Sequence, residues 1–180
     1  MKPWMLSFLV VGMVAGCSTP SGSTVVTPGG TVSTTNGPGG KVTTSVNTPD
    51  GKSVSSTTEG GKTTVTGSGG EKLVTGSDKV PNFGVDVYPG LKMVAGSAVE
   101  AETGQAKSAS ANFTTDDTVE KVVDFYKGKL GPTATVSNQT DNGSTLAFVT
   151  KTDGKVIVSV TISRNKDEKQ TNVTLTRNEQ

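Results

Sequence analysis

The side chains that could carry chemistry are few, and Cys17 is the most distinctive of them. It is the only cysteine, and the sequence contains no histidine. A single thiol cannot form an internal disulfide, a thiolate zinc site or a Cys-x-x-Cys redox pair. The missing imidazole removes the commonest metal ligand and the commonest general base. We therefore expect no metal site, no cofactor and no enzymatic activity. The chemistry left for Cys17 is modification of its own sulfur.

Asp116 and Asp117 are adjacent carboxylates, which in principle share a proton or bind a cation. They stand at the start of a predicted helix, where acidic residues are favoured by the helix dipole and by capping. A serine nucleophile would need a base, and no motif that supplies one accompanies the many serines. A carboxylate-dependent hydrolase is therefore only the weaker alternative.

The elements that position these residues begin with an apolar segment that ends at Cys17. Lys2 gives a short positive start, residues 4–15 are almost wholly apolar, and small residues precede the cysteine. An apolar stretch of about a dozen residues is typical of a signal peptide, whereas a membrane-spanning helix needs about 20. We therefore expect residues 1–16 to be a cleaved export signal.

The four residues Val14, Ala15, Gly16 and Cys17 resemble the lipobox of bacterial lipoprotein precursors. The resemblance implies cleavage between Gly16 and Cys17, a diacylglycerol on the Cys17 thiol and a further acyl chain such as palmitate on the new amino group. Stable anchoring needs more than one acyl chain, and such a modification supplies two or three. Ser18 is not the aspartate that resembles an inner-membrane retention signal. The cell outer membrane is therefore favoured if the host is Gram-negative.

The composition places a weakly apolar segment directly after the cysteine. Apolar residues make up 31% of the chain and aromatic residues 4%, and residues 17–78 are dominated by Ser, Thr and Gly. Turn signals such as Pro38-Gly39-Gly40 recur about every ten residues, and each run between them holds one or two valines. So little apolar surface does not offset the entropy of ordering the backbone. We expect a flexible tether. The alternative is a repetitive β-meander that a partner or self-association orders.

Residues 79–180 are expected to form the folded domain. Val119, Val122, Val123, Tyr126 and Leu130 share one face of a predicted helix, with Thr115 or Asp117 as its cap and Gly131 at its end. Alternating apolar residues then predict four strands, at Ala134–Thr140, Ser144–Lys151, Lys155–Ser163 and Thr171–Arg177. The expected fold class is α+β, a two-layer sandwich in which one helix packs on an antiparallel β-meander.

Three short motifs in this domain support an envelope protein without an assigned reaction. The sequence Val87-Tyr88-Pro89-Gly90, followed by Phe113-Thr114-Thr115-Asp116 and a helix with Phe125-Tyr126, resembles small exported bacterial α+β domains of unknown function. No functional residue is implied by this resemblance.

Together these features predict a membrane-anchored, non-enzymatic envelope lipoprotein whose C-terminal domain binds another component of the cell envelope. The expected partners are membrane lipid through acylated Cys17 and an unidentified envelope protein or glycan. Nucleic acid is excluded, because 17 basic residues face 16 acidic ones. The alternative is a structural or surface protein that acts through its Thr/Gly repeats.

The anchor is tested by the substitution Cys17→Ser. We expect an uncut, unlipidated precursor, because the hydroxyl does not replace the thiol as the alkylated nucleophile. Intact mass and membrane fractionation measure this. A mutant that is still processed and still membrane-bound would contradict the lipoprotein prediction.

Overall fold

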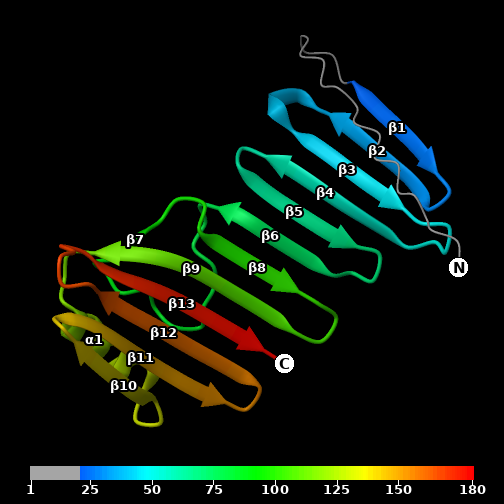
Figure 1. Cartoon of the computed structure of the whole chain (residues 1–180). Coiled ribbons are helices and arrows are strands. Elements are labelled where there is room, and N and C mark those ends of the chain that lie inside the picture. Colours follow the sequence, from blue (N-terminus) through cyan, green and yellow to red (C-terminus); the bar gives the residue numbers. More distant parts are fainter. Residues whose placement is uncertain (1–20) are drawn as a thin grey trace, which may run out of the picture.

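The computed structural model describes residues 21–180, and this part of the protein is mostly β (Figure 1). One antiparallel sheet of 13 strands runs in the order β1-β2-β3-β4-β5-β6-β8-β9-β13-β12-β11-β10, with β7 paired to β9. Within these residues there is one α-helix, α1 (Val119–Leu130), and a short 3₁₀ turn at Pro38–Gly40. The expected α+β two-layer sandwich, a helix packed on a four-stranded meander, is therefore wrong.

The Ser/Thr-rich segment forms the first six strands instead of the flexible tether expected for it. These are β1 (Gly22–Thr27), β2 (Gly30–Asn36), β3 (Val42–Asn47), β4 (Ser53–Glu59), β5 (Lys62–Gly67) and β6 (Lys72–Ser77). Each strand pairs antiparallel with the next. The recurrent glycine turns mark the strand ends, and Thr and Val favour the extended backbone between them. We name this part, residues 22–77, the open sheet.

The open sheet joins the rest of the protein through β6, which pairs with β8. The remaining strands are β7 (Lys92–Met93), β8 (Ala98–Glu102), β9 (Lys107–Thr115), β10 (Thr135–Asp141), β11 (Ser144–Asp153), β12 (Val156–Arg164) and β13 (Thr171–Glu179). The ladder of strands thus continues across residues 78 and 79, where the tether was expected to meet the folded domain. The short strands β7 and β8 were not predicted from the sequence.

The predicted helix is confirmed, and its apolar stripe is buried. All five predicted stripe residues are buried in α1: Val119, Val122, Val123, Tyr126 and Leu130. Thr118 caps the helix, its Oγ1 accepting from the Lys121 N–H, so the predicted caps Thr115 and Asp117 were wrong. Gly131 ends the helix with a φ of 82°, a conformation that favours glycine.

The four predicted C-terminal strands are also present, each within one or two residues of its expected ends. The hairpin between β10 and β11 turns at Asn142-Gly143, where both residues have positive φ values of 49° and 80°. This is the turn that an Asn-Gly pair favours between two strands. The local pattern was therefore interpreted correctly, although the fold class was not.

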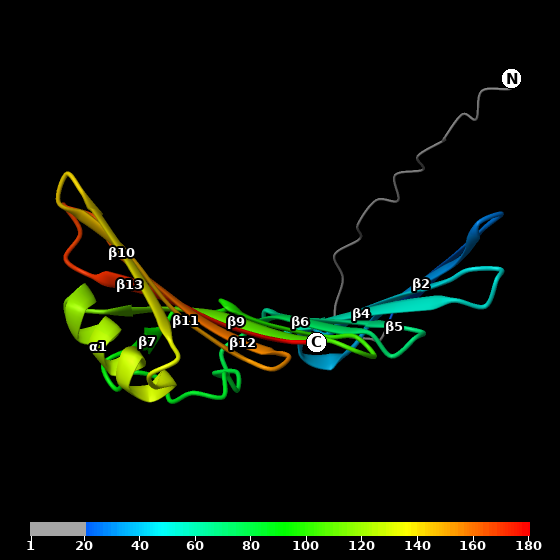
Figure 2. The same cartoon turned by 90° about the horizontal axis from the view of Figure 1, so that it is seen from below.

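The two faces of the sheet differ, and only part of one is covered. The face on which α1 lies is here called the helix-side face. Over the strands from the C-terminal half of the chain, α1 and the segment of residues 78–97 cover this face (Figure 2). The core lies there and includes Phe113, Val149, Val160, Ile162, Val173 and Leu175. The opposite face, here called the far face, carries mostly Thr, Ser and Asn over β9, β12 and β13, and the exposed Phe148 on β11. No element of residues 21–180 covers either face of β1–β4 (Figure 2).

This division predicts where the protein is sensitive to truncation of a side chain. Leu175→Ala should lower the free energy of unfolding by about 2–5 kcal/mol, because Leu175 is fully buried and its loss leaves a cavity. Val26→Ala should change it by less than about 0.5 kcal/mol, because Val26 in β1 is 77% exposed. Urea unfolding followed by circular dichroism measures both. Similar losses for the two variants would contradict the placement of the core.

Candidate functional site

The predicted lipid-attachment motif, Val14, Ala15, Gly16 and Cys17, lies outside the described residues. The lipid anchor therefore stays a prediction. The first described strand, β1, begins at Gly22, five positions after Cys17. An extended chain covers at most about 3.6 Å per residue, so β1 would start within roughly 18 Å of an acylated Cys17.

The carboxylates of Asp116 and Asp117 have separate partners, so the structure does not bring them together as an acid–base pair. Asp117 Oδ1 lies 3.0 Å from Lys121 Nζ, and its Oδ2 accepts from the Tyr88 hydroxyl at 2.8 Å. Asp116 Oδ1 instead accepts from Gln170 Nε2 at 3.3 Å. Asp117 thus acts as a link between the helix start and the segment that covers the sheet.

The two tyrosines belong to the same network and are structural. The Tyr126 hydroxyl, buried under the sheet, accepts from the Tyr88 N–H at 3.0 Å. Burial raises the pKa of Tyr126 to about 12, which keeps it a neutral phenol. Gly90 packs so closely that an added Cβ would lie 2.9 Å from the Tyr88 ring. The residues of the Tyr-Pro-Gly motif therefore hold the segment of residues 78–97 against α1.

Charge interactions fix the ionisation of this network. Hydrogen bonds from Lys121 and Tyr88 hold the pKa of Asp117 below its ordinary value. The carboxylate in turn raises the pKa of Lys121 and of the Tyr88 phenol. All three side chains are therefore in their ordinary charge states near neutral pH.

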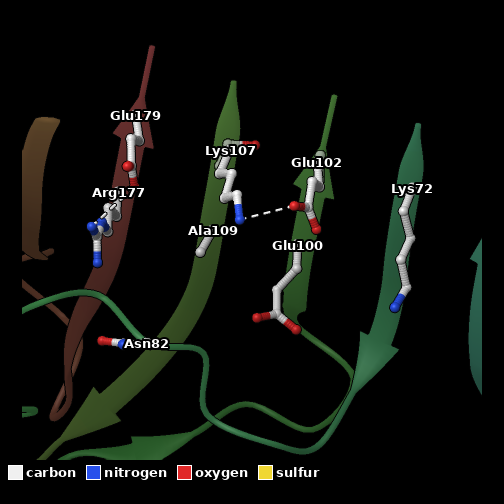
Figure 3. A pocket seen from close by; sticks show the side chains of 10 residues that line it. Lys72, Asn82, Glu100, Glu102, Lys107, Ala109, Arg177 and Glu179 are labelled. Atoms are coloured by element: carbon white, nitrogen blue, oxygen red, sulfur yellow. Dashed lines mark hydrogen bonds and ion pairs between the residues drawn. The ribbon is translucent and has the colours of Figure 1, made fainter. Parts of the chain in front are cut away.

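A cavity of about 310 Å³ on the helix-side face is the best candidate for a binding site (Figure 3). It lies where the cover of residues 78–97 ends and the open sheet begins. Asn82 from that segment lines it, and so do six charged side chains from four neighbouring strands. These are Lys72, Glu100, Glu102, Lys107, Arg177 and Glu179. We name this set the charged cavity.

Register brings the charges of the cavity together. Lys72, Glu102, Lys107 and Glu179 are cross-strand partners in one row across β6, β8, β9 and β13. Their signs alternate, which stabilises each pairing relative to like charges. Lys107 Nζ lies 2.9 Å from Glu102 Oε1, the contact drawn as a dashed line in Figure 3. In the next row, Glu100 and Arg177 flank Ala109.

The ion pair raises the pKa of Lys107 and lowers that of Glu102, chiefly through their hydrogen bond. Both side chains remain more than half exposed, so water screens the pair and exchange with the charges of a ligand costs little. A second cavity, of about 230 Å³, shares Arg177 and adds Lys151 and Asp153. The helix-side face therefore offers both signs of charge to a polar ligand.

Sequence reasoning missed this cavity, although one signal was available. Charged residues alternate along two of its strands, at Glu100 and Glu102 and at Arg177 and Glu179. Such alternation places both members of each pair on one face of a strand. These charges meet because β6 pairs with β8 and β9 pairs with β13. The two pairings bring together residues that lie far apart in the sequence. The strand pattern alone does not give that order.

The open sheet carries two different surfaces. On the helix-side face it presents rows of hydroxyls, such as Thr35, Thr43, Thr57 and Thr64 on successive strands. On the far face, a row of four valines crosses four strands: Val25, Val32, Val46 and Val54. We name these four residues the valine row. Three of them, Val25, Val46 and Val54, are exposed.

The pH dependence of stability tests the role of Asp117. Because its pKa is lowered in the folded protein, its stabilisation is present above the unfolded value of about 3.9 and is lost as the pH falls through the folded value. Asp117→Asn should therefore be less stable than the wild type at pH 7, and the difference should narrow below about pH 4. Urea unfolding at both pH values measures this. Asp116→Asn is the matched control, and an equal loss in that variant would contradict the assignment.

The described residues and the comparisons define no known class for this protein. Among residues 21–180, no helix is long and apolar enough to cross a membrane, and no group of three or more Cys, Asp or Glu side chains could hold a metal ion. Comparison with protein-family models, with curated proteins and with solved structures finds no match to this chain.

Proposed function

We propose that the protein is a lipid-anchored, non-enzymatic component of the bacterial envelope that binds another envelope component at the charged cavity. The single observation that carries this proposal is the cavity itself, with three cations and three anions brought from β6, β8, β9 and β13 around about 310 Å³. The lipobox-like motif that ends at Cys17 supports the anchor. Ligand pockets favour a few convergent polar groups within a concave surface.

The chemistry of the lining defines the ligand class. Lys107 and Arg177 suit carboxylate or phosphate groups, and Glu100 and Glu102 suit amines or sugar hydroxyls. A ligand that carries both kinds of group, such as a peptide or an amino-sugar glycan, complements all of them. With the anchor at residue 17 and the cavity beginning at β6, the five strands β1–β5 separate the binding site from the anchor.

Charge reversal in the cavity tests the binding proposal. Lys107→Glu combined with Arg177→Glu should reduce capture of the envelope partner by about tenfold or more, because like charges then face its anionic groups. Crosslinking of the full-length protein in native envelopes, followed by purification and mass spectrometry, measures this. Lys52→Glu is the matched control, since Lys52 pairs with Asp50 in an exposed turn of the open sheet.

An unchanged set of crosslinked components in the double variant would contradict binding at the cavity. The second candidate, a structural role of the repeats, is favoured by the open sheet, which is exposed on both faces. Deleting residues 21–60 separates the two, because it removes β1–β4 and leaves the β5–β6 hairpin paired with β8. Binding at the cavity should survive this deletion, whereas a function of the repeats should be lost.

A further inference from the structure

Within residues 21–180, the strand β1 is a sheet edge without the usual protection against pairing. All six of its residues, Gly22–Thr27, are exposed, and the sequence GSTVVT contains no charge and no proline. Its register with β2 is regular over the whole strand, so no bulge twists it away. Natural edge strands are normally blunted by such devices, and an edge without them pairs with another strand.

The backbone of β1 has a defined free side. The Ser21 carbonyl accepts from the Asn36 N–H at 3.0 Å, and the hairpin to β2 closes at the pair Thr27 and Gly30. Because hydrogen-bonded pairs alternate along an antiparallel ladder, Ser23, Val25 and Thr27 bond to β2. Gly22, Thr24 and Val26 therefore direct their N–H and C=O groups away from the sheet.

The side chains of β1 show which strand would match this edge. Val25 is the outermost member of the valine row on the far face. The hydrogen-bonding pattern of the free side permits an antiparallel register in which Val25 lies opposite Val25 of a second copy. In that register Thr24 faces Val26 of the second copy, and the two valine rows join into one row of eight.

We propose that two copies of this chain associate edge to edge through β1, related by a two-fold axis that passes beside Val25. The pairing is isologous, so the same five residues, Ser23–Thr27, serve on both copies and the assembly closes as a dimer. The uncharged strand meets itself without repulsion. The two open sheets then form one continuous sheet, with the eight residues of the two valine rows on a single face.

The other edge of the sheet, β10, is a poorer match for β1. Its residues on the far face are Thr135, Ser137 and Gln139, which are cross-strand partners of β11 residues on that face. Pairing of β1 with β10 of a second copy would place polar side chains beside Val25 and end the valine row. It would also leave one free edge on each copy, so that further copies could add without closure.

The backbone contact is tested by a pair of variants at Thr24. Thr24→Pro removes an N–H on the free side without removing a bond to β2, and proline is tolerated at such positions of edge strands. Thr24→Val keeps that N–H. Both variants lose the contact of the Thr24 hydroxyl with Ser33, so they differ chiefly in the backbone donor. Sedimentation of the purified full-length protein should show a dimer for Thr24→Val. For Thr24→Pro the association should be weaker, with a dissociation constant at least about tenfold higher.

The register is tested by disulfide trapping in native membranes. Val25→Cys should form a disulfide-linked dimer on mild oxidation, because directly opposite residues of a non-hydrogen-bonded pair have Cα atoms about 4.5 Å apart. Val54→Cys is the matched control, since Val54 belongs to the same row but lies on the interior strand β4. The unsubstituted chain, whose only thiol is Cys17, gives the background. The yield of disulfide-linked dimer from Val25→Cys should exceed the yields from Val54→Cys and from the unsubstituted chain by at least about tenfold.

Three results would overturn the proposal. The first is a Val25→Cys yield no higher than that of Val54→Cys. The second is an equal mass for Thr24→Pro and Thr24→Val. The third is a series of oligomers larger than the dimer that Thr24→Pro abolishes, which would indicate pairing of β1 with β10. The sedimentation result does not depend on Cys17, so failure of the anchor prediction can be distinguished from failure of the dimer proposal.

Discussion

The pairing of β6 with β8 is the contact on which the architecture depends. It joins a Ser/Thr-rich sheet without a core of its own to a half that is backed by α1 and the segment of residues 78–97. Val74 of β6 is the one core residue that the open sheet contributes, and it is buried at this junction. A strand added to an existing edge gains a full ladder of hydrogen bonds without a new nucleus. The order of the open sheet can therefore propagate outward from β8.

The stability of such a sheet is a sum of small free-energy contributions from each strand. Each hairpin loses backbone entropy and gains hydrogen bonds, side-chain contacts across the ladder and partial burial of one or two valines. Hydroxyl contacts such as Thr34 with Thr44 and Thr43 with Thr57 connect neighbouring strands on the two faces. Because each strand contacts only its neighbours, the net free energy of adding a strand is nearly the same for each one, as in repeat proteins. Stability against fraying should thus decrease from β6 toward β1.

The sequence allowed good prediction wherever a pattern was local. The stripe from Val119 to Leu130 and the Asn142-Gly143 turn located α1 and the β10–β11 hairpin within a residue or two. The fold class failed because the entropy argument treated residues 17–78 as an isolated chain, without the β8 edge on which β6 rests. The charged cavity was missed for a related reason. Lys72, Lys107 and Arg177 meet only through the strand order β6-β8-β9-β13, which no pattern along the chain specifies.

The same strand order explains why chemistry and association are separated in the molecule. Charges gather at the margin of the part that is backed by a core, where Arg177 of β13 and Glu100 of β8 both lie beside Ala109 of β9. Toward β1 the charges disappear from the strands, and hydroxyls and valines replace them. A surface without fixed charge carries little specificity for a small polar ligand, but its backbone edge recognises another extended strand. The change in surface from β13 to β1 therefore separates the proposed ligand site from the proposed assembly edge. The proposed binding site in the middle of the sheet and the proposed assembly edge at β1 share no residues, so both can act in one sheet.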